Sequence, residues 1–215
     1  MRVAYILAGQ GDLDQARQYL AQLRSSINDA ARKVELYLVE GDLLEKADAG
    51  TQAMNLYNDA LKRYPGNPRL LYARALLADR QGDLGQAEVD LGYIIEHHPD
   101  NAMALNALGY TLADRTNRYH EALGYIQRAL ALRPDDPAVL DSMGWVQYRL
   151  KHYAEALRYL RRAYAKFKDP EVAAHLVEVL FASGRRAEAQ STLDAALKAH
   201  PGDAKLERLR KRFVP

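Results

Sequence analysis

The sequence predicts an all-α fold, a helical solenoid in which one helix–turn–helix unit is copied and stacked. Six alanines recur at spacings of 37, 34, 35, 34 and 33 residues, and a fixed period near 34 is typical of such arrays. Apolar residues follow each alanine at four and seven positions, which makes one stripe along a helix. Prolines stand twelve positions after four of the alanines, where a helix must end. The alanines are Ala16, Ala53, Ala87, Ala122, Ala156 and Ala189.

Composition fits a folded chain with a balanced surface. The 215 residues are 48% hydrophobic and carry a formal net charge of +2, which gives no reason to expect nucleic acid or anionic lipid as the main partner. The chain has no cysteine, so disulfides, thiol catalysis and cysteine-bound zinc are excluded. The short apolar run at residues 1–9 is interpreted as helix, because no cleavage-like site comes after it.

Turn and cap residues divide the chain into helix pairs. Glycine–aspartate turns such as Gly82-Asp83 and cap–proline pairs such as Asp136-Pro137 mark the boundaries. The expected pairs are 30–47 with 50–64, 68–80 with 84–97, 101–115 with 119–132, 136–150 with 153–167, and 170–182 with 186–199. A single solenoid is therefore expected, divided into 1–28 (partial or atypical), 29–66, 67–100, 101–135, 136–169, 170–202 and a capping helix at 203–215.

Both ends of the chain carry expectations of their own. The stripe of Leu206, Leu209 and Phe213 suits a last helix that covers the open edge of the final repeat. In repeat register, Met1 falls about one turn inside a first helix without a cap. We therefore expect a C-terminal fragment of a longer array, with a natural start and a frayed helix as the alternative. An exposed first edge also makes self-association possible.

Small residues inside the first helices predict close helix contacts. Gly109 and Gly144 lie among leucines and methionine in the middle of expected helices. Glycine there costs about 1 kcal/mol relative to alanine, so its presence favours close approach of a second helix. We expect each glycine to meet the alanine that begins the second helix of its own repeat.

Two motifs of the sequence resemble a known family, the tetratricopeptide repeat (TPR). The motifs that carry the resemblance are Gly144-Trp145 ahead of Tyr153-Ala154-Glu155-Ala156-Leu157, and Leu108-Gly109-Tyr110 ahead of Tyr119-His120-Glu121-Ala122-Leu123. The family implies a right-handed superhelix of about five full repeats, here with a partial N-terminal repeat and the capping helix. It also implies a concave groove, lined by the first helices, that binds protein without catalysis or cofactors. Glu40 and Gly50 depart from the family pattern, which prefers large apolar and aromatic residues there.

A narrower resemblance concerns residues 106–115 and 141–146, which are similar to envelope TPR lipoproteins of Gram-negative bacteria. One such adaptor binds and activates a periplasmic carboxyl-terminal processing protease. The resemblance implies a protein that recruits this protease or its substrates on the periplasmic side of the outer membrane, with the lipid anchor upstream. The alternatives are a cytosolic assembly or regulatory scaffold, and an RNA-binding helical repeat.

The expected partner-binding groove runs along one face of the first helices. Aromatic residues with polar edges and a few charges suit protein-binding hot spots. Trp145 and the tyrosines have a second interpretation, packing between adjacent repeats. The groove residues are Tyr72, Leu76, Asp79, Asn106, Tyr110, Asp114, Asp141, Trp145, Tyr148, Arg149, Glu178 and Phe181.

Other binding modes have weaker support. No lysine occupies the groove positions 38, 42, 72, 76, 106 and 110, so a clamp for a partner's terminal carboxylate is not expected. The basic faces at 158–168 and 208–212 are interpreted as solvated surface, which is the commoner explanation of such a charge run. Aromatic residues that could stack bases are not evident on the same faces, which also disfavours RNA.

No catalytic or metal site is expected. His97 and His98 are adjacent and point to different faces of a helix. His120-Glu121 lacks the second histidine of a helical zinc site, and Gly9-Gln10-Gly11 lacks the strand and the lysine that a phosphate-binding loop needs.

Overall fold

The structure is a computed structural model that describes residues 1–213 and contains thirteen α-helices in that range. The chain divides into two compact units, at 1–99 and 100–215. Unit 1 comprises α1 (Arg2–Gly9), α2 (Leu13–Ser26), α3 (Ala30–Lys46), α4 (Gly50–Arg63), α5 (Pro68–Gln81) and α6 (Leu84–His97). Unit 2 comprises α7 (Ala102–Arg115), α8 (Tyr119–Leu132), α9 (Pro137–Arg149), α10 (Tyr153–Lys166), α11 (Pro170–Ala182), α12 (Arg186–Ala199) and α13 (Ala204–Phe213).

Cap residues set the helix boundaries where the sequence places them. The side chains of Asn67, Asp136 and Asp169 accept hydrogen bonds from backbone N–H groups at the starts of α5, α9 and α11, each followed by proline. Gly82 and Gly184 adopt φ of +81° and +80° after α5 and α11, a conformation that costs glycine little. Because these local signals determine where each helix starts and stops, the bounds of the ten predicted helices are confirmed to within two residues.

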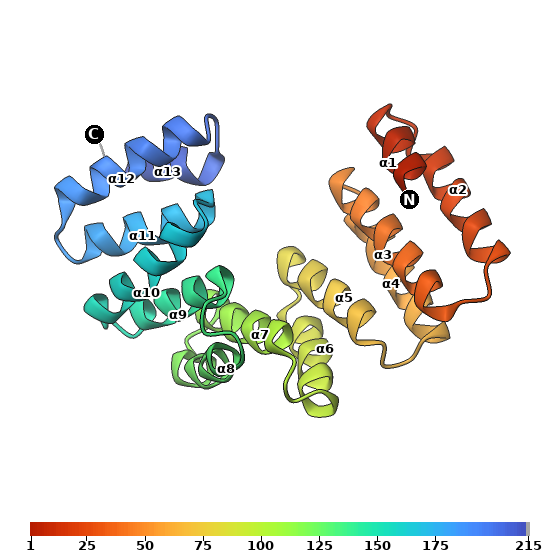
Figure 1. Ribbon diagram of the computed structural model, residues 1–215, viewed down its shortest axis with the longest axis horizontal. Helices are drawn as coiled ribbons and strands as arrows, with labels where there is room; N and C mark the ends of the chain where they lie inside the picture. Colours follow the sequence, from red (N-terminus) through yellow and green to blue (C-terminus); the bar gives the residue numbers. More distant parts are fainter. Residues whose placement is uncertain (214–215) are drawn as a thin grey trace. The chain divides into compact units, whose positions relative to one another are not determined.

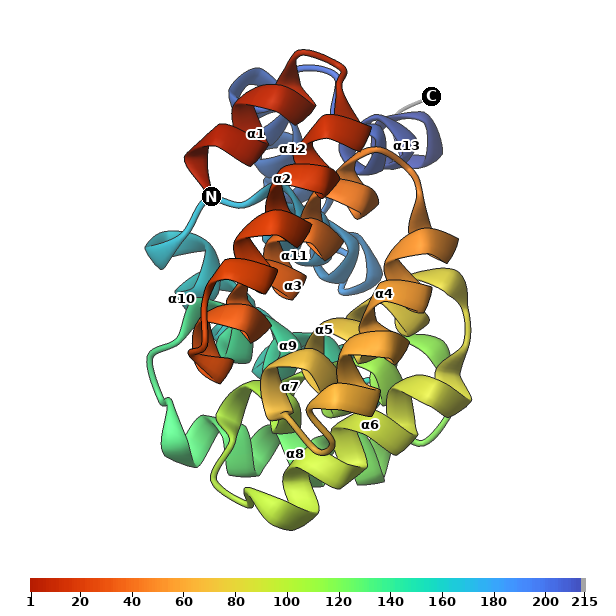
Figure 2. The same cartoon turned by 90° about the vertical axis from the view of Figure 1, so that its right-hand side faces the viewer.

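The helices of each repeat lie side by side and antiparallel, as Figures 1 and 2 show for α3 with α4 and for α5 with α6. In unit 2 the first helices also contact one another, α7 with α9, α9 with α11, and α11 with α13. We call these four helices the inner row. The second helices α8, α10 and α12 pack against the inner row. Two layers of helix therefore enclose the apolar core.

The repeating alanines lie at the centre of each helix pair. All six alanines are fully buried. The residue four positions after each alanine is buried too, and the most exposed of these six residues, Tyr57, is 2% exposed. A Cβ atom on Gly109 would lie 2.5 Å from Cγ1 of Ile126, and one on Gly144 would lie 2.5 Å from Cγ of Leu160. The carbonyl oxygens of Ala122 and Ala156 are also close to these positions. The expected close approach is therefore confirmed.

Unit 1 contains two buried carboxylates whose ion pairs join neighbouring helices. Glu40, 3% exposed, accepts hydrogen bonds from Arg17 at 3.1 Å and Arg24 at 2.6 Å. Asp90, 1% exposed, accepts two from Arg74 at 2.8 and 2.7 Å. A buried carboxylate is tolerated when it is paired and hydrogen-bonded. This pairing explains how Glu40 occupies a position where the family prefers an apolar residue.

The last helix covers the end of unit 2. Leu206 and Leu209 of α13 are buried against Ala173, Ala174 and Val177 of α11, and the ring of Phe213 stacks on Phe181 at 4.1 Å. The predicted capping helix is therefore present over residues 204–213, and residues 214–215 lie outside the described range. Within residues 1–213, no helix is long and apolar enough to span a bilayer.

Candidate protein-binding site

A network of polar side chains crosses the inner row of unit 2. Its centre is His175 of α11, which is 1% exposed, and its Nδ1 lies 2.9 and 3.0 Å from the two carboxylate oxygens of Asp141 on α9. Asp141 is itself only 6% exposed. A carboxylate accepts hydrogen bonds, so this contact assigns a proton to Nδ1. The other ring nitrogen, Nε2, then faces the remaining members of the network.

Those members are Tyr110 of α7, Glu171 of α11 and Lys205 of α13. The hydroxyl of Tyr110 donates to Oε1 of Glu171 at 3.2 Å and lies 3.4 Å from Nε2 of His175. Nζ of Lys205 donates to the same Glu171 oxygen at 3.0 Å and lies 3.3 Å from Nε2 of His175. The five side chains therefore connect all four helices of the inner row.

Burial and charge fix the protonation states of two members. Burial raises the pKa of the Tyr110 hydroxyl far above its ordinary value, and the Glu171 carboxylate adds to the effect. Burial alone would raise the pKa of Glu171, but the charge and hydrogen bond of Lys205, together with His175 and Tyr110, outweigh it and lower that pKa. Tyr110 is therefore a neutral donor at pH 7, and Glu171 is an anion.

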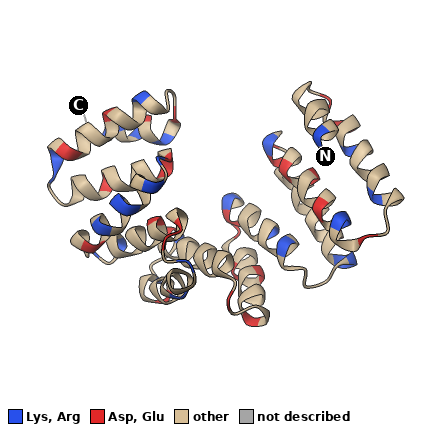
Figure 3. Ribbon diagram, in the orientation of Figure 1, with Lys and Arg blue, Asp and Glu red and all other residues tan. Residues whose placement is uncertain are grey.

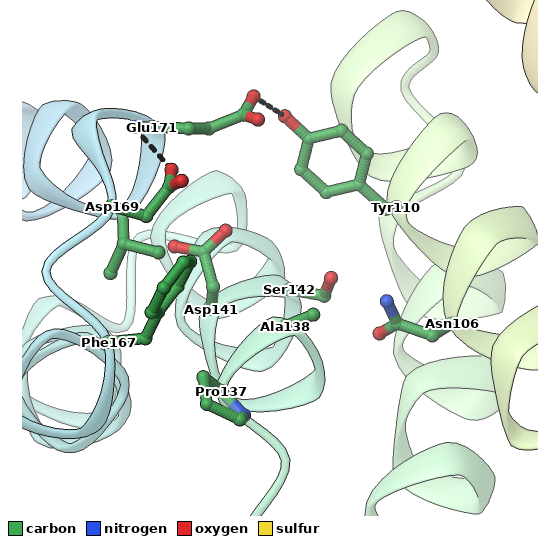
Figure 4. A pocket seen from close by; sticks show the side chains of 10 residues that line it. Asn106, Tyr110, Pro137, Ala138, Asp141, Ser142, Phe167, Asp169 and Glu171 are labelled. Carbon is green, nitrogen blue, oxygen red and sulfur yellow. Dashed lines mark hydrogen bonds between the residues drawn. The ribbon is translucent and has the colours of Figure 1, made fainter. Parts of the chain in front are cut away.

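A pocket of about 310 Å³ opens beside this network. Figure 4 shows Asn106 and Tyr110 of α7 on one side, α9 residues along the base, and the segment from Phe167 to Glu171 on the other side. Phe167 is 59% exposed although it is a large apolar residue. The lining residues are Asn106, Tyr110, Pro137, Ala138, Asp141, Ser142, Phe167, Asp169, Glu171 and Val172.

Aromatic rings extend the site along the inner row. Trp145 is 7% exposed and stacks on the imidazole of His175 with ring centroids 4.2 Å apart. The ring centroid of Tyr148 lies 5.2 Å from that of Trp145, and Tyr148 is partly exposed. Burial, followed by the charge of Glu178, raises the pKa of the Tyr148 hydroxyl. Of the two interpretations of Trp145, packing between adjacent repeats is therefore the one that the structure shows. Tyr148 and Phe181 remain partly accessible on the same helices.

The other predicted groove residues have separate positions. Tyr72 and Leu76 line a hollow of unit 1 together with Leu38 and Asp42, and Asp79 is partly buried on the same helix. Nη1 of Arg149 donates to the backbone carbonyl of Asp114 at 3.1 Å, and Nη2 donates to the hydroxyl of Tyr119 at 2.7 Å. Arg149 therefore holds the α7–α8 turn, and its side chain remains partly exposed.

Sequence reasoning missed three members of the network and one wall of the pocket. His175 was detectable, because it is the single titratable residue in the buried apolar run at 172–177, and such a residue needs a partner. No local sequence pattern marks Glu171, Lys205 or Phe167 as part of a binding site. Lys205 precedes the basic residues 208–212 of α13, whose pattern indicates solvated surface.

The predicted basic faces carry acidic partners. Arg158 pairs with Glu155, Arg161 with Glu188, and both Arg162 and Lys166 with Asp135. Figure 3 shows acidic and basic segments interspersed on the helices of unit 2. Such pairs are typical of a solvated face. Within residues 1–213, no cluster of three or more histidine, aspartate or glutamate side chains has metal-binding geometry.

Comparison with known proteins identifies the family. Models of the tetratricopeptide repeat match residues 4–68, 38–94, 72–137 and 147–213. The chain belongs to the tetratricopeptide repeat family. The TPR repeat-containing protein PA4667 of Pseudomonas aeruginosa is 49% identical over 178 residues, which are 83% of this chain and 30% of that protein. The TPR chain thus spans less than a third of this relative.

Solved structures agree on the fold. TTC0263, a TPR protein of Thermus thermophilus, has a TM-score of 0.75 and 23% identity, covering 84% of this chain and 98% of its own. A TPR protein of Parabacteroides merdae has a TM-score of 0.78 and 18% identity, covering 99% of this chain and 83% of its own. At these identities the likeness is one of fold alone. Tetratricopeptide repeats generally form non-catalytic scaffolds for protein–protein interaction.

Proposed function

We propose that this TPR chain binds a segment of a partner protein on the inner row of unit 2, and that it acts without chemistry of its own. The observation that carries the proposal is the pocket of about 310 Å³ beside the Asp141–His175 network, with the exposed ring of Phe167 at its rim. An accessible aromatic residue beside a fixed polar network is the composition of a protein-binding hot spot.

The network suits this role because it is already ordered. Four of its five side chains come from three different repeats, and Lys205 comes from the capping helix. Hydrogen bonds among Tyr110, Glu171 and Lys205 hold these groups in place before a partner arrives. Groups that are fixed in advance lose little conformational entropy on binding, which favours affinity.

We further propose that the protein is an adaptor that recruits and activates a periplasmic carboxyl-terminal processing protease or its substrates. The protein would then act on the periplasmic side of the outer membrane. The support is the similarity of residues 106–115 and 141–146 to envelope TPR lipoproteins. Holding protease and substrate together raises their effective concentration without any catalytic residue. A cytosolic assembly scaffold is the alternative.

A capture experiment with the whole chain tests both levels of the proposal. The immobilised chain is offered an envelope extract and a cytosolic extract, beside a variant with Phe167→Ala and Tyr148→Ala. Leu132→Ala on α8, which is 43% exposed, serves as the matched control. The adaptor proposal is supported if the chain captures a periplasmic protease, the double variant does not capture it, and the control variant still does. Capture of a cytosolic complex overturns the adaptor, and capture unaffected by the double variant overturns the proposed surface.

A further inference from the structure

The pocket beside the network has a charge that points to one class of occupant. We infer that it receives a lysine or arginine side chain of the bound protein segment, with an apolar neighbour of that residue lying on Phe167. The inference rests on the proposed function, because it names the chemistry that the inner row of unit 2 selects.

All charged residues of the lining are acidic. Asp141, Asp169 and Glu171 all line the pocket, and none of its ten lining residues, all within the described range, is a lysine, arginine or histidine. The ammonium group of Lys205, which does not line the pocket, pairs with the carboxylate of Glu171, and His175 contacts the carboxylate of Asp141. Asp169 has no ion-pair partner among residues 1–213, and its carboxylate accepts one backbone hydrogen bond, from Glu171 at 2.8 Å. A cation that enters the pocket therefore meets a carboxylate that caps the N-terminus of α11 and pairs with no basic side chain among the described residues.

Two further features of the pocket, a buried acceptor and an exposed aromatic ring, also match a lysine or arginine side chain. Oδ1 of Asn106 is buried in the pocket wall and lacks a donor among the described residues, and a buried acceptor without a donor is costly. The ring of Phe167 is 59% exposed at the opposite wall (Figure 4). A lysine or arginine presents several N–H donors at the end of an apolar stem, and the stem packs on an aromatic ring.

The volume limits how much of a partner enters. About 310 Å³ lies at the lower end of the roughly 300–1,000 Å³ range of small-molecule sites. One long side chain and part of its neighbour fill this space. The pocket therefore reads a single basic position of the segment, and the partly exposed Tyr148 and Phe181 contact the adjoining residues of that segment.

Selection from a displayed library of random peptides on the immobilised full chain tests the inference. We expect enriched peptides to share a lysine or arginine beside an apolar residue. Synthetic copies of the enriched peptides are then titrated with each protein in fluorescence polarisation. Compared with the parent chain, Asp169→Asn should bind them with a Kd about tenfold weaker, and Phe167→Ala with a Kd about threefold weaker. Asparagine still caps α11, so the first variant removes charge without removing the cap.

The control is Asp29→Asn, which makes the same change at the cap of α3, where the Asp29 carboxylate accepts the Ala31 amide at 2.8 Å. It should leave the Kd unchanged. Enriched peptides without a basic residue, or basic peptides that Asp169→Asn binds as tightly as the parent chain, overturn the inference. If those peptides lose affinity in Tyr148→Ala, the proposed binding surface stands and only its specificity is wrong. A selection that enriches no peptide also overturns the inference.

Discussion

His175 donates its Nδ1–H to the carboxylate of Asp141, 2.9 Å away, from the first helix of the following repeat. Both side chains are almost completely buried. The indole of Trp145 stacks on this imidazole, with the two ring centroids 4.2 Å apart. One histidine therefore joins the polar and the aromatic parts of the inner row.

His175→Ala should destabilise unit 2 by about 3 kcal/mol, because it leaves the buried Asp141 carboxylate without its partner and opens a cavity under Trp145. Urea denaturation followed by circular dichroism measures the loss. His120→Ala on α8, an exposed site, is the control and should change stability by less than about 0.5 kcal/mol. Equal effects of the two variants would show that the pair is dispensable.

Gly144→Ala should destabilise the protein by about 1–2 kcal/mol. Its Cβ would lie 2.5 Å from Leu160 and 3.2 Å from the carbonyl oxygen of Ala156, and overpacking outweighs the gain of about 1 kcal/mol in helix propensity. Gly124→Ala in α8 is the matched control, because nothing lies within 4 Å of its added Cβ. That variant should stabilise by about 0.5–1 kcal/mol. Thermal melts of both variants must therefore shift in opposite directions.

Asp90→Ala should cost about 3–5 kcal/mol, because it leaves the partly buried guanidinium of Arg74 without its carboxylate. Asp59→Ala removes an exposed carboxylate that pairs with Lys62, and should cost about 0.5 kcal/mol or less. Denaturation of unit 1 by urea compares the two variants. A small loss for Asp90→Ala would mean that the ion pair between α5 and α6 contributes little.

Stability should fall as the pH rises from about 10 to about 12. Burial, followed by the charge of Asp42, raises the pKa of Tyr57 to about 12, and burial raises that of Tyr110 further. Unfolded tyrosines ionise near a pH of about 10, so in this window the unfolded state loses protons that the folded state keeps. Tyr57→Phe should make the fall shallower than in the parent chain. An identical slope for the two proteins, measured by urea denaturation at each pH, contradicts this assignment.

Repeat register and cap chemistry predicted the fold because both are local. Asp136-Pro137 and Asp169-Pro170 begin α9 and α11 where expected. The buried alanines and the glycine contacts result from the same spacing. That all repeats form one solenoid stays a prediction of the sequence.

The candidate site was only partly predictable, because its contacts cross repeats. Tyr110 and His175 are 65 positions apart, and Lys205 and His175 are 30 apart. The helix pattern places Asp141 on the correct face, but nothing local marks it as the buried partner of a histidine. Similarly, no pattern predicts that Phe167, just after α10, forms a pocket wall.

Site-specific photo-crosslinking asks directly whether a partner protein binds at the inner row. A benzophenone amino acid replaces Phe167 at the pocket or Leu132 on α8, both exposed apolar positions of unit 2, and each protein is irradiated with the envelope and cytosolic extracts. We expect a discrete crosslinked partner from position 167 and none from position 132. A partner crosslinked only from position 132, or equally from both, would rule out the inner row as the binding surface.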